Sequence, residues 1–309
     1  MDYNLVPNSP LITVGLPFFN AEKTLRLAIE SSVTQEFQNF ELILVNDGST
    51  DGSSRIAHEY LSDRRVMLLE DGKNLGLAPR LNQITALSRG DYIARMDADD
   101  VMHPSRLRKQ ISLLEADPRV DLVSSGVHVI DGSYRILGFR RTVRVRVCHK
   151  FSYLQLFHPT VTGRKRWFQR NPYSCEFLRC EDTELWIRTQ GESNVVILDE
   201  PLLFFNRVGS FELEKTLRSL QQFRNILRLH RQRTCRWCRF ASIMVTEAKA
   251  ICYRILWCSG LSGAATARWS VEPLGICERE LAEKALYSLI RDVKEREIAK
   301  LRAHAATVS

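Results

Sequence analysis

The sequence predicts an α/β protein: an open, mostly parallel β-sheet with helices on both faces, followed by a helical C-terminal extension. From residue 11 to about residue 131, short apolar runs alternate with segments of helical spacing, which is typical of such a sheet. The runs are continuously apolar, as expected of strands buried on both faces. From residue 211 onward the pattern is helical. We therefore expect three regions, 1–131, 132–210 and 211–309.

The first region carries the alternation of strands and helices. The first strand is expected to stop at Pro17, and the fourth helix has Pro104 in its first turn, where proline is favoured. The expected strands are 11–16, 42–45, 65–71, 91–100 and 120–131, and the expected helices are 21–33, 53–62, 77–88 and 104–117.

The alternation of predicted strands and helices ends after residue 131. Residues 132–175 look basic and irregular, with a strand region expected at 154–165. A short helix is expected at 181–190 and closing strands at 194–208. In the last region, Leu213, Leu217, Leu220 and Leu227 fall on one helical face. A strongly amphipathic helix is expected at 240–257 and a charged helix at 278–301.

The composition is that of a soluble globular protein, with 44% hydrophobic and 26% charged residues. No run of about 18 uncharged apolar residues suggests a membrane-spanning helix. The N-terminus lacks a basic stretch followed by an apolar one, so we expect a cytoplasmic protein. The eight cysteines are then expected to be reduced thiols. Cys235 and Cys238 lack the second ligand pair that a structural zinc site requires.

The charge is unevenly distributed. Residues 1–131 carry 13 Lys/Arg and 19 Asp/Glu, whereas residues 132–309 carry 31 and 17. Residues 132–175 hold ten basic and no acidic side chains, and residues 215–240 hold eight and none. Such a basic half favours an anionic partner, namely nucleic acid, a phospholipid surface or a phosphorylated substrate, although a solvated basic face has the same composition.

Polar motifs follow three of the predicted strands. Residues 17–20 follow the first, Asp47 ends the second, and Asp97, Asp99 and Asp100 end the fourth. Ligands of open α/β sheets bind at the carboxyl ends of strands, so these motifs are expected to share one cleft. Clustered carboxylates suit a hard cation such as Mg²⁺ or Mn²⁺, whereas the alternative for the three aspartates is a solvated turn before the next helix.

Other nucleotide-binding signatures are missing. The chain has no G-x-G-x-x-G after the first strand and no G-x-x-x-x-G-K-[ST]. A dinucleotide-dependent dehydrogenase and a P-loop enzyme are therefore disfavoured. Phosphate groups would have to be held by a metal ion and by side chains.

These motifs, in this order, resemble family 2 glycosyltransferases of the GT-A fold. The resemblance runs over about residues 11–208 and rests on "LPFFNAEKTL", "ELILVNDGSTDGS", "NLGLAPRLNQ", "GDYIARMDADD", "HPSRL", "HPTV", "CEDTELWIR" and "LDEPLLFFNRV". It implies transfer of one sugar, with inversion, from a nucleotide diphosphate sugar. The implied acceptor is a glycan or a lipid-diphosphate-linked saccharide of bacterial surface polysaccharide, O-antigen or capsule biosynthesis. Residues 1–131 would bind the donor, and residues 132–210 would bind the acceptor and carry the catalytic base.

The resemblance also implies a nucleotide-binding set. Asp47 matches the aspartate that hydrogen-bonds the base, which is usually uracil, so a UDP-sugar is the expected donor. Phe19 stands where the family commonly has a tyrosine that packs on the base. The remaining members of the implied nucleotide-binding set are Pro17, Asn20, Arg80 and Asp97.

Metal and base roles follow from the same resemblance. Asp97 and Asp99 match the D-x-D pair that holds Mn²⁺ or Mg²⁺, with Asp99 as the principal ligand. Asp182 matches the catalytic base, although a residue at the start of a helix can also be a helix cap. The chemistry requires such a base, because inversion needs one group opposite the leaving diphosphate to accept the proton of the attacking hydroxyl.

The sequence departs from the family in two places. The segment "QRNPYSCEFLR" replaces a common Gly-Gly-Tyr/Phe-Asp element, so acceptor contacts there are not implied. "QRTCRW" is one residue longer than the Q-x-x-R-W of processive synthases, which favours the addition of one sugar per encounter. Two alternatives stay open: a non-catalytic homologue that binds nucleotide or carbohydrate, and a nucleotidyltransferase. Nucleic-acid binding is disfavoured because an acidic cleft repels phosphates unless a metal is bound.

The C-terminal region offers a further partner. Beside the basic stretch 215–240, an apolar helical face is expected from Phe240, Met244, Ile251, Ile255 and Trp257. Such a face suits peripheral binding to an anionic membrane, for example the inner face of the plasma membrane. Alternatively, it packs on the catalytic domain or on a second subunit of a homodimer.

Overall fold

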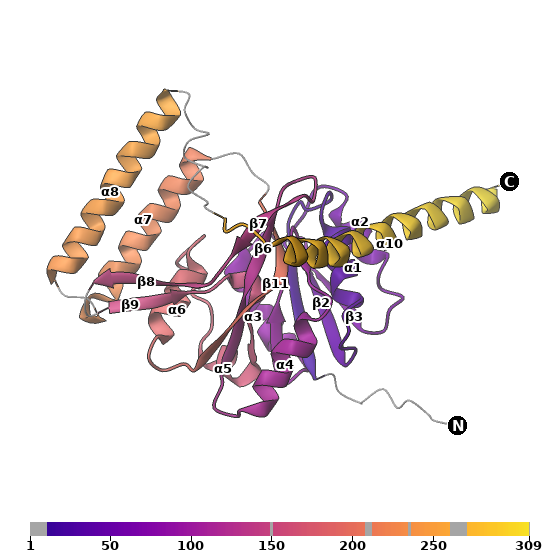
Figure 1. The fold of residues 1–309 in the computed structure, drawn as a ribbon, viewed down its shortest axis with the longest axis horizontal. Coiled ribbons are helices and arrows are strands. Elements are labelled where there is room, and N and C mark those ends of the chain that lie inside the picture. The colour runs from indigo at the N-terminus through magenta and orange to yellow at the C-terminus, as the bar shows by residue number, and fades with distance from the viewer. Residues whose placement is uncertain (1–10, 149–150, 208–211, 234–235, 260–270, 309) are drawn as a thin grey trace.

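A single large sheet organises the molecule (Figure 1). The computed structural model describes residues 11–148, 151–207, 212–233, 236–259 and 271–308. The nine-stranded sheet has the order β3-β2-β1-β4-β10-β6-β11-β5, with β7 paired to β6, and β8 and β9 form a separate hairpin. The strands are β1 Ile12–Phe18, β2 Phe40–Asn46, β3 Val66–Glu70, β4 Tyr92–Arg95, β5 Val101–Met102, β6 Leu122–Ile130, β7 Ile136–Arg140, β8 Val143–Cys148, β9 Phe151–Gln155, β10 Thr162–Arg164 and β11 Val195–Asn206.

Helices cover both faces of the sheet, as predicted. Buried residues of α1, α2 and α4 pack with one face of β1 and β2, and those of α3, α5 and α6 pack against the other. The continuously apolar runs of β1 and β2 are buried along their whole length, which explains their lack of alternation. The helices are α1 Leu25–Val33, α2 Ser53–His58, α3 Leu77–Leu87, α4 Arg106–Ala116, α5 Lys165–Arg170, α6 Glu181–Thr189, α7 Leu213–Leu229, α8 Arg236–Cys258 and α10 Ile276–Val308, with short 3₁₀ turns at His158–Thr160 and Arg231–Arg233.

The first strand does not stop at Pro17 but continues to Phe18. On the β4 side, Gly15 accepts a hydrogen bond from the amide of Met96, and on the β2 side Phe18 accepts one from Asp47. The backbone groups of successive residues in a parallel strand point in turn to the strand on one side and to the strand on the other. The nitrogen of Pro17 therefore points toward β4, but β4 has already ended at Arg95, the partner of Gly15. The proline therefore removes no ladder hydrogen bond, which is why the strand tolerates it.

The segment 132–175 is more regular than its sequence suggests. Residues 143–147 alternate valine and arginine, and they form β8 of the hairpin β8–β9. The expected strand region 154–165 is instead divided among the end of β9, a 3₁₀ turn and the three-residue β10. The closing strands are one strand, β11, whose register against β6 shifts around Pro201. A strand is recognised in a sequence by the alternation of apolar and polar residues, and short strands and a register shift leave too few residues for that pattern to be seen.

The C-terminal helices lie in two separate places. The start of α10 packs against α1, β5 and β11 through a buried cluster that includes Ala282, Leu286 and Leu289. Arg296 of α10 also pairs with Glu30 of α1. By contrast, α7 and α8 form a pair at the other side of the molecule, with α8 outermost (Figure 1). Among the described residues, none of the helices combines the length and apolarity needed to cross a bilayer.

Candidate active site

Three strand ends meet at one edge of the sheet. β1 pairs in parallel with β2 on one side and β4 on the other, with Phe18 opposite Asn46 and Gly15 opposite Arg95. The polar motifs that follow these strands therefore lie along one edge, as the strand pattern predicts. The chain order reverses across β1, which is the position where open α/β sheets bind ligands.

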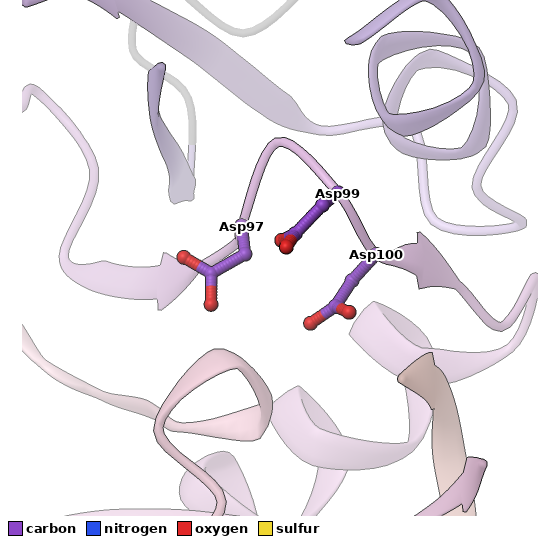
Figure 2. A group of neighbouring side chains, drawn as sticks. All are labelled: Asp97, Asp99 and Asp100. Atoms are coloured by element: carbon purple, nitrogen blue, oxygen red, sulfur yellow. The ribbon is translucent and has the colours of Figure 1, made fainter. Parts of the chain in front are cut away.

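The acidic cluster lies at this edge, in the loop between β4 and β5. Asp97, Asp99 and Asp100 lie next to one another along this loop (Figure 2), and one ligand oxygen from each lies within 4.8 Å of the others. Asp97 forms an ion pair with Arg95 at 2.5 Å. Asp99 reaches solvent, yet its pKa is raised to about 6, first because the surrounding protein displaces water and second because of the charge of Asp97.

Asp100 carries the least satisfied carboxylate of the cluster. The residue is buried, and its Oδ1 accepts a hydrogen bond of 2.8 Å from the backbone amide of Asn206, where β11 ends. Its Oδ2 is buried without a hydrogen-bond partner. Burial first, and then the charges of Asp97 and Asp99, hold its pKa well above the usual range. An orphaned buried oxygen beside two more carboxylates fits a hard divalent cation, whose charge would favour the ionised form of Asp99 and Asp100.

Asp47 and Arg80 form a buried pair that shapes the loop beside β2. The carboxylate of Asp47 accepts hydrogen bonds from the amides of Leu75 (2.8 Å) and Gly76 (3.0 Å) and from Arg80 Nε (2.8 Å). Arg80 is fully buried and also binds Asp71, which lowers the pKa of that carboxyl group. Arg80 therefore positions Asp47 and the loop 71–76. Direct contact of Asp47 or Arg80 with a nucleotide stays a prediction.

The segment after β1 joins the same loop system. Asn20 adopts a left-handed conformation (φ 49°), and its Oδ1 accepts a hydrogen bond of 2.8 Å from the amide of Thr50. Its own amide donates to Ser49 Oγ at 3.0 Å. Phe19 is 49% exposed, so its ring is accessible for stacking, whereas Pro17 is buried in the strand. Asn20 thus ties the end of β1 to the Asp-Gly turn after β2.

A cleft of about 500 Å³ brings Asp97 together with Asp182. Asp182 is the second residue of α6, whose N-cap is Cys180, so Asp182 is not the cap itself. Its carboxylate accepts a hydrogen bond of 2.6 Å from the amide of Thr183. Burial raises the pKa of Asp182. Burial, and then the charge of Asp182, raise the pKa of the neighbouring Glu181 to about 7.

Two further side chains of this cleft were not anticipated from the sequence. Arg95, the last residue of β4, is buried, forms an ion pair with Asp97, and lines the cleft together with the acidic start of α6. His158 is buried, with Nε2 at 2.9 Å from the Tyr173 hydroxyl. Burial holds its pKa well below the usual range, so His158 is neutral. It lies in the "HPTV" motif, but sequence spacing did not place it beside Asp182.

Several other residues that line the cleft are basic. They are Arg140 from the end of β7, Arg141, and Arg179, which lies two residues before the start of α6. Arg179 is exposed and has a left-handed backbone (φ 70°). Tyr253 of α8 lines the cleft as well. The cleft therefore joins carboxylates from the sheet edge and α6 to arginines drawn from distant parts of the chain.

Comparison with known proteins identifies the family to which this arrangement belongs. Residues 13–177, more than half of the chain, match the family model described as Glycosyl transferase family 2. The chain belongs to this family. The resemblance inferred from the motifs is thereby confirmed. The family match covers β1 through Phe177, so it includes the acidic cluster but ends just before Asp182.

Curated relatives share part of this chain. A Bacillus subtilis protein named as a glycosyltransferase, EpsE, is 40% identical over 126 residues, which cover 40% of this chain and 45% of EpsE. The Escherichia coli protein WfgD, named as a UDP-Glc:alpha-D-GlcNAc-diphosphoundecaprenol beta-1,3-glucosyltransferase, is 28% identical over 192 residues, which cover 60% of this chain and 72% of WfgD. The chain spans 45%, 65% and 38% of three curated relatives it matches, EpsE among them.

A solved structure resembles nearly the whole chain. The mannosyltransferase PcManGT from Pyrobaculum calidifontis, solved in complex with GDP-Man and Mn²⁺, aligns with a TM-score of 0.56 at 17% identity, over 98% of this chain and 87% of that one. At this level of identity the likeness concerns the fold alone. It confirms the α/β class with the curled open sheet of the GT-A fold.

Proposed function

We propose that this protein is an inverting, metal-dependent glycosyltransferase that moves one sugar from a nucleotide diphosphate sugar to a glycan or lipid-diphosphate-linked acceptor. The observation that carries the proposal is the cleft in which Asp97 of the acidic cluster and Asp182 of α6 come together. Binding a nucleotide or a carbohydrate requires no base, whereas transfer to a hydroxyl does. The cleft thus supports an enzyme rather than a non-catalytic binding homologue.

The donor is proposed to lie along the strand ends. The exposed ring of Phe19 would stack on the base, and the Asp47 carboxylate would bind it, held in place by Arg80. Pro17 and Asn20 would shape the same pocket from the end of β1. A UDP-sugar is the favoured donor, supported by the name of WfgD, while PcManGT was solved with GDP-Man. The base of the nucleotide is therefore the first property to measure.

Asp99 and Asp97 would hold Mn²⁺ or Mg²⁺, and a carboxylate oxygen of Asp100 lies close enough to contribute to the site. When bound, the cation would supply the positive charge that stabilises the departing diphosphate. Arg95 adds a fixed positive charge beside Asp97. The manganese in the PcManGT complex supports a divalent ion for this fold.

Asp182 is proposed to accept the proton of the acceptor hydroxyl. Its raised pKa makes it a stronger base than an exposed aspartate. Arg140, Arg141 and Arg179 lie in the same cleft and would attract an acceptor that carries phosphate. A lipid-linked diphosphate has that chemistry, and the name of WfgD contains such an acceptor. We propose that such an acceptor is met at the inner face of the plasma membrane, in surface polysaccharide biosynthesis.

A donor screen tests this proposal. Hydrolysis of UDP-, GDP- and dTDP-sugars is measured with Mn²⁺, with and without EDTA, for the native protein and for Asp99→Ala. We expect slow hydrolysis of one nucleotide class that EDTA and Asp99→Ala both abolish, while circular dichroism shows an unchanged fold. Full activity in EDTA would overturn the metal assignment. Release of pyrophosphate from a nucleoside triphosphate in place of sugar transfer would favour a nucleotidyltransferase.

A further inference from the structure

The helix α8 exposes the apolar side chains that a helix ordinarily buries. It is the outermost element of its side of the molecule and contacts α7 and β8 (Figure 1). The side chains it buries are small, Thr246 and Ala250. Its exposed large apolar residues other than Trp257 are Trp237 (80% exposed), Phe240 (56%), Met244 (51%), Val245 (54%), Ile251 (54%) and Ile255 (62%). We call these six residues the α8 apolar face. A contiguous exposed surface of this kind marks an interaction site.

The helical period places these residues on one side of α8. At about 100° per residue, Trp237, Met244 and Ile255 lie within about 20° of one another. The same period places the charged residues of α8 outside this stripe, at its flanks or on the far side. From Trp237 to Ile255 the stripe is about 27 Å long at 1.5 Å per residue. Trp257, expected from the sequence to share this face, lies about 160° from Ile255 by the same period and does not belong to it.

The surroundings of the α8 apolar face are basic. Arg231, Arg236 and Arg254 are exposed at its ends and flank, and Glu247 of α8 is already paired with Arg224 of α7. Residues 215–240 contain no acidic side chain. In a two-fold dimer the same surface meets itself, so this interface would bring arginines from both copies together without acidic residues of that stretch to pair with them. An anionic lipid surface complements both the charge and the apolar face.

We propose that the α8 apolar face docks onto the surface of an anionic phospholipid bilayer, with α8 lying in the plane of the interface. Since no helix in the described ranges is suited to cross a bilayer, α8 would lie on the membrane rather than span it. Tyr253 projects from the opposite side of α8 and lines the cleft. Docking would therefore hold the cleft about one helix diameter, roughly 10 Å, from the membrane surface. That a membrane-bound acceptor would reach the cleft there rests on the proposed function, whereas the docking itself does not.

Vesicle sedimentation of the full-length protein tests the docking. Phosphatidylcholine vesicles with and without phosphatidylglycerol are compared at low and high salt. We expect binding to the anionic vesicles that weakens as salt is added, because exposed charge is screened within about 10 Å at 0.1 M salt. Met244→Glu together with Ile251→Glu should reduce binding about tenfold or more, since two apolar side chains lose their burial. Leu61→Glu together with Leu87→Glu, which adds the same two charges at exposed positions outside α8, should leave it unchanged.

Each outcome separates docking from its alternatives. A native protein that stays in the supernatant with anionic vesicles at low salt overturns the proposal. If the double variant instead changes the molecular mass measured by light scattering from dimer to monomer, the face is a self-interface and the proposal is wrong. Asp182→Asn should bind vesicles like the native protein while losing transfer, and the double variant should retain donor hydrolysis. Failure of docking is thereby distinguished from failure of the proposed catalytic function.

Discussion

The two sides of the cleft are built in different ways. On the proposed donor side, carboxylates follow parallel strands and are fixed by backbone groups, as Asp47 is by Leu75 and Gly76 and Asp100 is by Asn206. On the proposed acceptor side, Arg179 lies in an exposed loop with a left-handed backbone. Asp182 belongs to α6, the next element along the chain, and is bonded by the adjacent Thr183.

This difference follows the chemistry that each side is proposed to serve. A nucleoside diphosphate is a constant ligand, so a preorganised scaffold of strand ends lowers the cost of binding it. An acceptor differs from one enzyme to another, and loops on a rigid scaffold are where such differences accumulate. We therefore expect donor-side substitutions to alter nucleotide binding and stability, and acceptor-side substitutions to alter turnover or acceptor affinity alone. Four substitutions or conditions test this separation.

The largest expected effect on the acceptor side comes from Asp182→Asn. The amide keeps the shape of the carboxylate but cannot accept a proton, so turnover should fall by about 10²-fold or more. Nucleotide affinity, measured by calorimetry with UDP and Mn²⁺, should stay close to that of the native protein. A matched Glu181→Gln variant serves as the control, because it removes the adjacent carboxylate. Near-normal turnover of Asp182→Asn with a large loss in Glu181→Gln would move the base to Glu181.

Much of the donor side could be predicted from sequence, and little of the acceptor side. Continuous apolar runs identified the parallel strands, and the rule that ligands bind at their carboxyl ends then located Asp47 and Asp97. The cleft arginines gave no local signal, because Arg140 and Arg179 come from segments with short strands and loops. The orphaned oxygen of Asp100 also required the structure, since its burial depends on contact with the distant β11.

The pH dependence of turnover should reflect the raised pKa of Asp182. Burial disfavours the ionised form, and the base acts only when ionised. Turnover is therefore expected to be full above the raised pKa and to fall by about tenfold per pH unit below it. This fall should begin at a pH above about 3.9, the value for an exposed aspartate. Turnover at saturating donor and acceptor checks this, and a profile flat down to about pH 4 would contradict the assignment.

A smaller effect is expected from Asp47→Ala on the donor side. The substitution removes the acceptor of two loop amides and of the buried Arg80. Leaving buried donors unsatisfied costs about 1–3 kcal/mol, which should appear as a lower midpoint of urea unfolding. UDP affinity should fall as well, while turnover at saturating donor changes less than affinity. The control is Asp51→Ala, an aspartate of the same loop system whose partners are the exposed amide of Glu22 and that of Ser53. Equal losses in both variants would show that the loop, rather than the Asp47 carboxylate, governs nucleotide affinity.

The smallest effect is expected from Arg179→Gln, which distinguishes acceptor binding from donor binding most directly. Arg179 is exposed in the free protein, so Arg179→Gln should leave the unfolding midpoint and UDP affinity unchanged. If its guanidinium meets an acceptor phosphate in a solvated cleft, the interaction is worth about 0.5–1 kcal/mol, and the Michaelis constant for the acceptor should rise about two- to fivefold. The rise should shrink at high salt and should be absent with a neutral acceptor that lacks phosphate. Arg179→Lys keeps the charge and should recover most of the affinity. A rise in the Michaelis constant for the donor instead would place Arg179 on the donor diphosphate, and the two sides of the cleft would then share that ligand.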